Sequence, residues 1–384
     1  MRPFSLYLHI PWCQAKCPYC DFNSYAASTW PEERYTEALQ RELANAAAQD
    51  RWRGRRIHSI FFGGGTPSLF SPESIARVLR EVESLWSPEP EIEITLEANP
   101  GTVTRDRLSG FAAAGINRLS FGVQSFVGRH LRALGRIHSG EDAVNALGWA
   151  VEAGFRRTNL DLIYALPGQT LAEWQSDLDA VCALGPEHVS AYNLTYEEGT
   201  AFHEWRARGQ LQQQHEDDEL AMFERAREVL GAAGYRQYEI SNYARPGAEC
   251  RHNLNYWRAG DYLGVGAGAH SFASGTAGQV GERWSNFKAP TRYLTAVESH
   301  GHAVETREPI DPERARGEFV FLNLRCRDGF PADAFVDRFG MPMEEAFPHS
   351  LGLREDGLLE ENEGRWRLSP RGLVLADSVF ATFV

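Results

Sequence analysis

The chain has 384 residues, of which 43% are hydrophobic and 24% are charged, a composition typical of a globular protein without membrane spans. Its formal net charge of −13 disfavours nucleic-acid binding, because proteins that hold nucleic acid through phosphate contacts normally carry a basic surface. No apolar run approaches the roughly 20 residues needed to cross a bilayer, and we expect no signal peptide.

The first half of the chain alternates short apolar runs with amphipathic helical patterns. This alternation predicts β-α units, in which each helix packs back onto a sheet. Ser71 and Pro72 give one helix start signal, a capping residue followed by proline. We expect strands at 5–10, 57–62, 91–97, 118–124, 158–165 and 188–195, and helices at 30–48, from 71, at 105–114, 140–153 and 171–183.

Six β-α units predict a parallel sheet that right-handed crossovers curl into a barrel. Because a closed TIM barrel has eight units, we expect a partial (β/α)6 barrel over residues 1–200. The alternation then stops, and residues 201–305, which begin with a charged helix, are expected to complete the barrel. Residues 306–384 change pattern again and predict a smaller C-terminal α/β domain of winged-helix type.

Three of the six cysteines, Cys13, Cys17 and Cys20, form a C-x3-C-x2-C motif without a fourth cysteine nearby. Three thiolates can hold three irons of a cubane 4Fe–4S cluster and leave the fourth iron open to a ligand. Zinc is an alternative, because His9 could complete its four ligands, and unmetallated thiols are another. The other three cysteines are scattered, so we expect no disulfide framework and a reducing cytoplasm.

Each predicted strand ends in a polar or glycine feature. The first ends in the cysteine motif, and the others end in Gly63-Gly64-Gly65-Thr66, Glu97, Gln124, Asp161 and Thr195. Any one of them could be an ordinary loop cap, but the ends of parallel strands converge on one face, which favours a shared site.

The glycine run would let backbone N–H groups approach a ligand closely. Carboxylates and an amide at neighbouring strand ends suit the ammonium and hydroxyl groups of an amino-acid nucleoside. Arg136 could bind a carboxylate as a bidentate fork, or it could be a surface arginine.

Together these residues resemble the radical S-adenosylmethionine (SAM) superfamily, whose signature is a three-cysteine loop followed by a glycine-rich strand end. Within it, Tyr7-Leu-His-Ile-Pro-Trp-Cys13, Gly122-Val-Gln-Ser125 and Asp161-Leu-Ile-Tyr-Ala-Leu-Pro-Gly168 are similar to oxygen-independent coproporphyrinogen III dehydrogenases and their relatives. The resemblance covers nearly the whole chain.

The resemblance implies that Cys13, Cys17 and Cys20 hold a 4Fe–4S cluster, with SAM on its open iron. That dehydrogenase holds two SAM molecules, so some matching positions need contact nothing here. The positions that match its SAM contacts are Tyr7, Tyr19, Gly64, Gly65, Thr66, Glu97, Gln124, Arg136, Asp161, Thr195 and, in a weaker alignment, His270.

Two features separate the relatives from one another. The dehydrogenase has a further cysteine two residues after the third, where this chain has Phe22. The segment Arg251-His-Asn-Leu-Asn-Tyr-Trp257 resembles the haem chaperone branch, HemW, described as binding haem and passing it to acceptor proteins. Residues 201–305 are then the candidate haem-binding region, with His252 as a candidate haem ligand or a buried, hydrogen-bonded histidine.

This branch implies haem as cargo, an unidentified haem-acceptor protein as partner and a transient membrane contact. The alternative function is the dehydrogenase itself, a radical SAM oxidoreductase of haem biosynthesis. The sequence therefore leaves open whether the chain is an enzyme.

Overall fold

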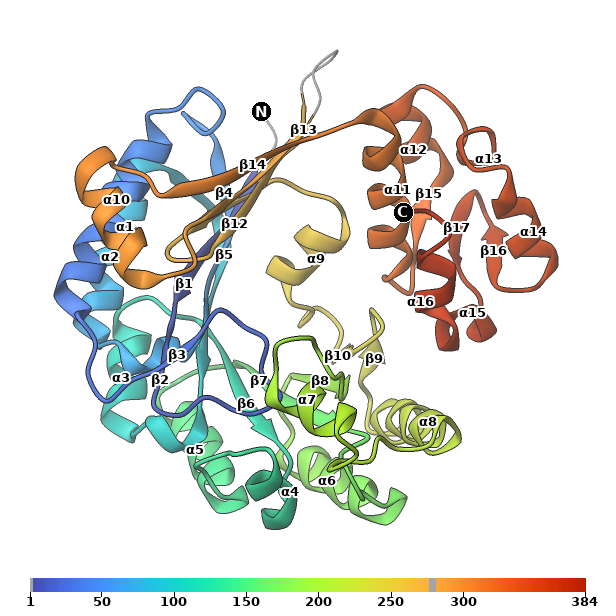
Figure 1. Ribbon diagram of the computed structural model, residues 1–384, viewed down its shortest axis with the longest axis horizontal. Helices are drawn as coiled ribbons and strands as arrows, with labels where there is room; N and C mark the ends of the chain where they lie inside the picture. Colours follow the sequence, from blue (N-terminus) through green and yellow to red (C-terminus); the bar gives the residue numbers. More distant parts are fainter. Residues whose placement is uncertain (1–2, 276–280) are drawn as a thin grey trace.

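The computed structural model describes residues 3–275 and 281–384 and shows a strongly curved sheet with helices around its outer side (Figure 1). All six predicted strands are present, and neighbours in the chain are parallel neighbours in the sheet. They are β1 (Phe4–Ile10), β4 (Arg56–Gly64), β5 (Ser87–Ala98), β6 (Arg118–Gln124), β7 (Arg157–Tyr164) and β8 (His188–Asn193).

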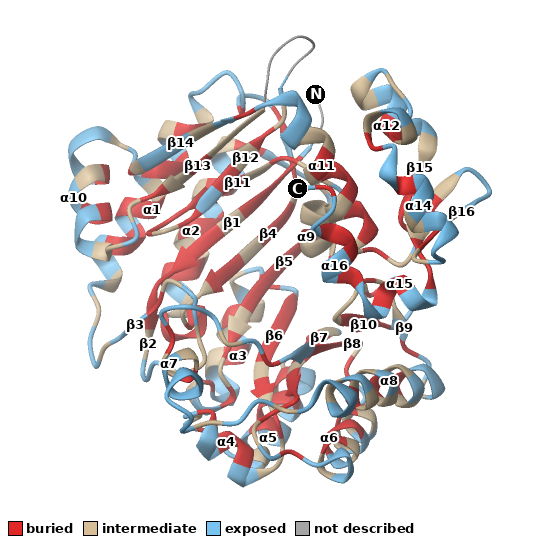
Figure 2. Cartoon of the chain, turned by 45° about the vertical axis from the view of Figure 1, so that its right-hand side comes forward, coloured by how far each residue is buried: buried red, intermediate tan, exposed pale blue. Residues whose placement is uncertain are grey.

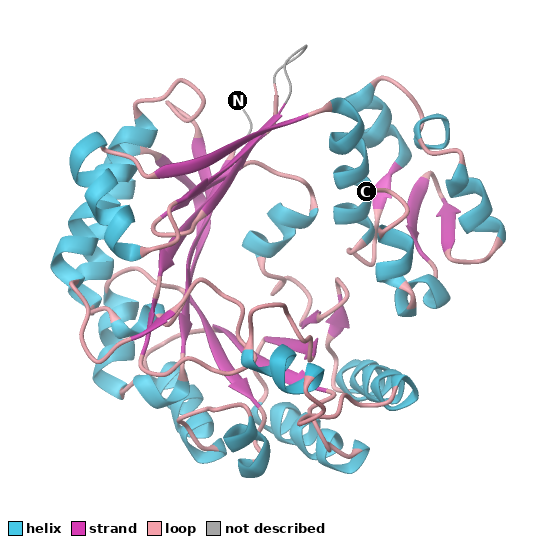
Figure 3. Cartoon of the chain, in the orientation of Figure 1, coloured by secondary structure: helices cyan, strands magenta, loops and turns pink. Residues whose placement is uncertain are grey.

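Helices connect these strands and cover the outer face of the sheet (Figure 3). Their starts follow from the local sequence. The Ser71 side chain accepts a hydrogen bond from the Ser74 amide, and Ser139 and Thr170 each form a capping box. The helices are α1 (Glu32–Ala47), α2 (Pro72–Leu85), α3 (Arg105–Ala113), α4 (Gly128–Ala133), α5 (Gly140–Glu152) and α6 (Leu171–Leu184).

The middle part of the chain extends the sheet at both edges. Strand β11 (Tyr262–Val265) pairs in parallel with β1, and antiparallel strands β12 (His270–Ala273), β13 (Gly281–Asn286) and β14 (Val304–Ile310) follow. At the other edge, β10 (Asn242–Ala244) and β9 (Arg236–Gln237) follow β8. In this twelve-stranded order β14 and β9 are the two edges, so the barrel is open.

Four helices accompany this extension: α7 (Ala201–Ala207), α8 (Glu216–Ala232), α9 (Arg251–Trp257) and α10 (Pro290–His300). Figure 1 shows α9 on the inner side of the curved sheet, whereas α10 lies outside beside α1. Because β14 reaches Ile310 within the large sheet, we propose that the C-terminal domain starts after this residue rather than at 306.

The two faces of the sheet differ in chemistry. Successive strand residues point to opposite faces, and Leu119, Phe121 and Leu160 belong to the main hydrophobic core. The opposite face carries Arg118, Ser120, Asn159, Asp161, His188 and Ser190, which line a cavity. In a TIM barrel, branched apolar side chains fill the corresponding space. Here the inner face is polar and lines a cavity, so the interior of the barrel forms a chamber. Figure 2 shows the strands themselves as buried.

The C-terminal domain has a hydrophobic core of its own, which includes Phe335 and Trp366. Its helices α11 to α14 surround β15 in the chain, a small antiparallel sheet of order β15-β17-β16 is completed by β16 and β17, and two short helices follow, as expected of a winged-helix-like domain. The elements are α11 (Pro312–Leu324), β15 (Phe330–Pro331), α12 (Ala332–Phe339), α13 (Met343–Ala346), α14 (His349–Glu355), β16 (Leu359–Asn362), β17 (Arg365–Leu368), α15 (Pro370–Val374) and α16 (Ala376–Phe380).

This domain contacts the open side of the barrel. The amide of Arg327 donates to the Tyr238 carbonyl over 2.9 Å, and Arg325 lies 3.5 Å from the Glu239 carboxylate. Across the described residues, no helix combines the length and the apolar character that a bilayer crossing requires.

Candidate functional site

A cavity of about 1250 Å³ lies between the inner face of the barrel, the cysteine loop, α8 and the C-terminal domain. The three cysteines of the motif line it. So do eleven of the other predicted site residues: Tyr7, Tyr19, Gly64, Gly65, Thr66, Glu97, Gln124, Arg136, Asp161, Thr195 and His252. The exception is His270, an exposed residue at the start of β12 that is not part of the lining, so the geometry gives no support to its role.

The cysteine loop is closed at its base by two short paired strands, β2 (Trp12–Cys13) and β3 (Tyr25–Ala26). Inside the loop, the Cys20 amide donates to the Cys17 carbonyl over 3.1 Å. The Lys16 ammonium donates to the carbonyls of Phe22 at 2.7 Å and Ser24 at 3.1 Å. This closure brings the three thiols to one side of the cavity, each partly exposed to it.

The glycine run packs against the start of the cysteine loop. Its amides are used within the protein: Gly64 donates to Glu97 Oε2 at 3.2 Å, Gly65 to the Ile10 carbonyl at 2.8 Å and Thr66 to the Trp12 carbonyl at 2.8 Å. A Cβ atom on Gly65 would lie 2.6 Å from the Trp12 carbonyl oxygen. The glycines are therefore needed for close backbone packing, and these amides are not free to contact a ligand as the sequence suggested.

A hydrogen-bond donor lies beside each of two of the three cysteine sulfurs. Thr66 Oγ1 donates to Cys13 Sγ at 3.4 Å, and Arg136 Nη1 lies 3.6 Å from Cys17 Sγ. Arg136 Nη2 also donates to the Gly122 carbonyl at 2.6 Å, while its buried Nε has no partner. Donors to thiolate sulfurs stabilise iron–sulfur clusters and tune their potentials. The donor set therefore fits a thiolate-held cluster with a guanidinium beside it.

The zinc alternative requires His9 as a fourth ligand. Both of its ring nitrogens are already in hydrogen bonds: Nδ1 with the Tyr7 hydroxyl at 3.0 Å and Nε2 with the Asn23 carbonyl at 2.8 Å. Burial lowers the pKa of His9 to about 4, so the ring is neutral at physiological pH. Across the part of the chain that the structure describes, no three His, Cys, Asp or Glu side chains form a site for a single metal ion. These contacts favour the cluster over zinc.

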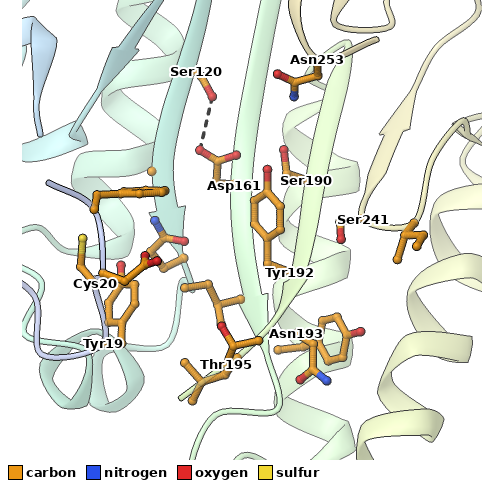
Figure 4. Close-up of a pocket in the computed structure, with 18 of the residues that line it drawn as sticks. Tyr19, Cys20, Ser120, Asp161, Ser190, Tyr192, Asn193, Thr195, Ser241 and Asn253 are labelled. Atoms are coloured by element: carbon orange, nitrogen blue, oxygen red, sulfur yellow. Dashed lines mark hydrogen bonds between the residues drawn. The ribbon is translucent and has the colours of Figure 1, made fainter. Parts of the chain in front are cut away.

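Two carboxylates face the cavity from neighbouring strands. Burial, with the nearby Asp161 as a second cause, raises the pKa of Glu97 to about 8. The pKa of Asp161 is also raised by burial, although Ser120 donates to its Oδ2 at 3.3 Å (Figure 4) and Asn159 to its Oδ1 at 2.8 Å. Strongly perturbed carboxyl groups in a cavity indicate a functional site. Here they could accept hydrogen bonds from ammonium or hydroxyl groups.

The remaining strand-end residues surround the same space. Gln124 ends β6 with a φ of 70°, the left-handed region that a residue with a side chain rarely adopts, and such strain is typical of binding sites. Tyr19 packs against Phe202, with ring centroids 6.1 Å apart. Thr195 is exposed just beyond β8, and Figure 4 shows it near Tyr19 on the same side of the cavity.

His252 lies on α9 with only 1% of its surface exposed. Its Nδ1 is 2.9 Å from Ser59 Oγ and its Nε2 is 2.9 Å from the Tyr256 hydroxyl. Burial lowers its pKa to about 3. The geometry thus corresponds to the alternative expected from the sequence, a buried, hydrogen-bonded histidine, rather than to an available haem ligand.

The sequence interpretation missed a deeper polar network on β6, β7 and β8. His188 Nδ1 lies 2.6 Å from Asn159 Oδ1, and Ser190 Oγ donates to the same oxygen at 3.2 Å. Arg118 lines the same part of the cavity. A signal was present, because polar residues recur at every second position, as at 118 and 120 or 188 and 190.

Comparison with known proteins identifies the family of the chain. Residues 7–181 match the radical SAM superfamily and residues 310–375 match the HemN C-terminal domain. The solved structure of coproporphyrinogen III oxidase (HemN) from Escherichia coli, a radical SAM enzyme, is similar with a TM-score of 0.84 and 26% identity, over 100% of this chain and 90% of that one.

Curated relatives match over their full length. "Heme chaperone HemW" of Haemophilus influenzae is 40% identical over 100% of this chain and 98% of its own, and that of Escherichia coli is 38% identical over 100% and 99%. The bovine "Radical S-adenosyl methionine domain-containing protein 1, mitochondrial" is 37% identical over 99% of this chain and 87% of its own. Membership of the radical SAM superfamily implies a 4Fe–4S cluster and SAM as cofactors. The chain belongs to the HemW family of radical SAM proteins.

Proposed function

We propose that this protein is a haem chaperone, which binds haem and transfers it to acceptor proteins while it holds a 4Fe–4S cluster and SAM. Relatives that are 34–40% identical over essentially the whole chain bear the name heme chaperone. Their similarity supports the proposal, and the geometry of the cavity supports it independently.

In this proposal Cys13, Cys17 and Cys20 hold three irons of the cluster, and SAM binds the fourth iron. The cluster supplies an electron to SAM when both are bound. Arg136 lies beside Cys17 Sγ and would pair with the carboxylate of SAM as a fork. Glu97 and Asp161 would accept hydrogen bonds from its ammonium and ribose hydroxyl groups. The remaining contacts that we propose are Tyr7, Tyr19, Gln124 and Thr195, together with Gly64, Gly65 and Thr66, which would contribute atoms other than their amides.

The observation that carries haem binding is an apolar rim on this polar cavity. Five large side chains that line the cavity are also exposed, from 36% to 62%: Phe22, Tyr192, Leu220, Val374 and Leu375. They come from the cysteine loop, the end of β8, α8 and the link between α15 and α16. Grouped exposed apolar side chains indicate a binding surface, and a porphyrin presents a wide apolar face with polar acid groups.

The size of the cavity supports more than one ligand. Its volume of about 1250 Å³ exceeds the roughly 300–1000 Å³ of an ordinary small-molecule site. SAM beside the cysteine loop would therefore leave space for a second ligand against the apolar rim. Phe22, which is 62% exposed, stands where the dehydrogenase has a cysteine and extends this rim.

We propose haem and a haem-acceptor protein as partners, and a transient membrane contact where that acceptor is membrane-bound. We place the protein in the cytoplasm, because all six cysteines are free thiols and a thiolate-held cluster needs a reducing compartment.

The test is anaerobic reconstitution with iron and sulfide, followed by titration of haem into the protein. We expect the double variant Phe22→Ser with Leu375→Ser to weaken haem binding by about 10-fold, because each exposed apolar side chain that haem would cover loses part of its roughly 1.5–3 kcal/mol of burial energy. Val151→Ser, an exposed apolar residue on α5 outside the cavity, is the control.

Equal haem affinity in the double variant and the wild type would remove the apolar rim from the proposal. Absence of haem binding by fully reconstituted wild type would remove the chaperone function. For transfer, the haem-loaded protein is mixed with an apo-haemoprotein, and apomyoglobin serves as a passive trap. A transfer rate above the rate of spontaneous release into the trap is the expected result.

His252 gives a separate prediction. We expect His252→Ala to lower the free energy of unfolding by about 2–4 kcal/mol, because it leaves a cavity and removes a hydrogen-bond partner from Ser59 and Tyr256. The visible spectrum of bound haem should remain unchanged. A changed ligand-field spectrum in a folded variant would instead identify His252 as a haem ligand that is released from both hydrogen bonds on binding.

A second candidate function is oxygen-independent coproporphyrinogen III dehydrogenase. The observation in its favour is the likeness of the whole chain to HemN, at a TM-score of 0.84. Phe22 in place of the further cysteine speaks against it. Anaerobic assay of the same reconstituted sample with coproporphyrinogen III decides between the two, and formation of protoporphyrinogen would establish the enzyme.

A further inference from the structure

Arg118 lies deep in the cavity, far from the cysteine loop. It is the first residue of β6, and Gln124, at the cluster end, is the last. At about 3.3 Å per residue, the six steps between them span about 20 Å. Arg118 lines the cavity although only 3% of its surface is exposed. Its guanidinium therefore reaches this inner end of the chamber.

The Arg118 side chain forms no hydrogen bond and no ion pair with the described residues. Burial opposes the charge of Arg118, but the surrounding Cys250, Glu93, Tyr238 and Asp161 raise its pKa above the usual value. The two carboxylates lie beyond ion-pair distance of the guanidinium and have other contacts. Glu93 Oε1 accepts from the His252 amide at 3.1 Å, and its Oε2 faces Arg157 at 3.6 Å. Asp161 accepts from Ser120 and Asn159. The guanidinium is kept charged without a direct ion pair, so this position can accept an anionic ligand.

The neighbouring polar side chains are hydrogen-bonded to one another and form a wall beside this guanidinium. Asn159 donates to Asp161 and accepts from Ser190, while His188 lies between Asn159 and the Tyr238 hydroxyl at 2.9 Å. In Figure 4, Ser120 and Ser190 lie in the upper part of the view, and Tyr19 and Thr195 lie in the lower part. Because these wall residues already satisfy one another, Arg118 is the charged donor that this part of the wall offers a ligand.

We propose that Arg118 is a carboxylate-binding subsite at the inner end of the cavity. This inference rests on the proposed function and deepens it: the carboxylate is a propionate of the bound tetrapyrrole. The carboxylate of SAM is the other source of the same chemistry. It is disfavoured, because Arg136 stands beside Cys17 and donates to the Gly122 carbonyl, whereas Arg118 lies four residues, about 13 Å, earlier on the same strand.

The test compares haem with haem dimethyl ester, which lacks free propionates, in the reconstituted protein. Wild type is expected to bind haem at least about 10-fold more tightly than the ester, and Arg118→Gln is expected to reduce this ratio to about one. Arg118→Lys should give an intermediate ratio, because it keeps the charge and loses the fork. The control is Arg156→Gln, an exposed arginine before β7, which should keep the wild-type ratio.

Each outcome decides the proposal. If wild type binds haem and its ester equally, the subsite is overturned while the chaperone function stands. If wild type binds no haem, the chaperone function fails, and SAM is compared with decarboxylated SAM. If Arg118→Gln then loses affinity for SAM but not for decarboxylated SAM, the subsite is supported with SAM as its source. If its affinity for both compounds is unchanged, the subsite is overturned. If Arg118→Gln does not fold, the test uses the ratio of haem affinity to ester affinity measured in the wild type and in Arg118→Lys.

Discussion

Replacing Cys17 with serine is expected to abolish the 4Fe–4S cluster. The motif has three thiolates and no spare cysteine within the loop, so losing one leaves two irons without a protein ligand, the open one included. The anaerobically reconstituted wild type should contain about four iron and about four sulfide per chain, and the variant almost none. Iron and sulfide analysis with the visible absorption spectrum makes the measurement.

The matched control is Cys182→Ser, which changes a half-buried thiol on α6 that does not line the cavity. This variant should keep the full cluster. Full iron and sulfide in Cys17→Ser would contradict the proposed ligand set, and a colourless wild type with one bound zinc would contradict the cluster itself. The two variants differ only in which thiol is removed, so the comparison separates ligand loss from general damage.

The order and direction of the six barrel strands could be predicted because strand and helix periodicities are local properties of the sequence. Leu119 and Phe121 alternate with polar residues, and Ser71 and Ser139 cap the helices that follow. The extension at both sheet edges could not be predicted in the same way. Strand β9 has two residues and β10 three, and such short strands exist only because neighbouring strands pair with them.

For the site, sequence reasoning succeeded where a residue type has few alternatives and failed where the environment decides. Clustered cysteines in a reducing compartment have few roles other than metal binding, and the three cysteines of the motif line the cavity together. The sequence predicts His252 as a candidate haem ligand and His270 as a weaker match to a SAM contact. One is buried with both ring nitrogens hydrogen-bonded, and the other is exposed outside the cavity lining. Arg118 was missed because its lack of a close partner is a property of the fold.

The C-terminal domain contributes directly to the cavity, a contribution that no sequence pattern predicted. The residues around α15 and α16, from Leu373 to Ser378, line it opposite the barrel strands. Contacts between Arg325 and Glu239 hold this domain at the barrel edge.

A second large effect is expected from the buried carboxylate of Glu42 on α1. Its Oε2 accepts from the Tyr293 hydroxyl at 2.7 Å and the Gly266 amide at 3.0 Å, and its Oε1 accepts from Asn286 at 2.6 Å. Glu42→Leu leaves these three buried donors unpaired and should lower the free energy of unfolding by about 3–5 kcal/mol. Urea denaturation measures it, with the exposed Glu37→Leu on the same helix expected to stay within about 0.5 kcal/mol.

The same carboxyl group predicts how stability depends on pH. Burial raises the pKa of Glu42 from 4.5 to about 7, so the folded state holds this proton more tightly than the unfolded state. The stabilising contribution is therefore complete below pH 4.5 and is lost as the pH rises to about 7, by about 1.4 kcal/mol per pH unit.

Other buried groups titrate in the same range, so the informative quantity is the difference in unfolding free energy between wild type and Glu42→Gln, which cannot ionise. Relative to Glu42→Gln, the wild type should lose about 3 kcal/mol of unfolding free energy between acid and neutral pH. Above neutral pH the difference between the two proteins should stay constant. A difference independent of pH would contradict the raised pKa.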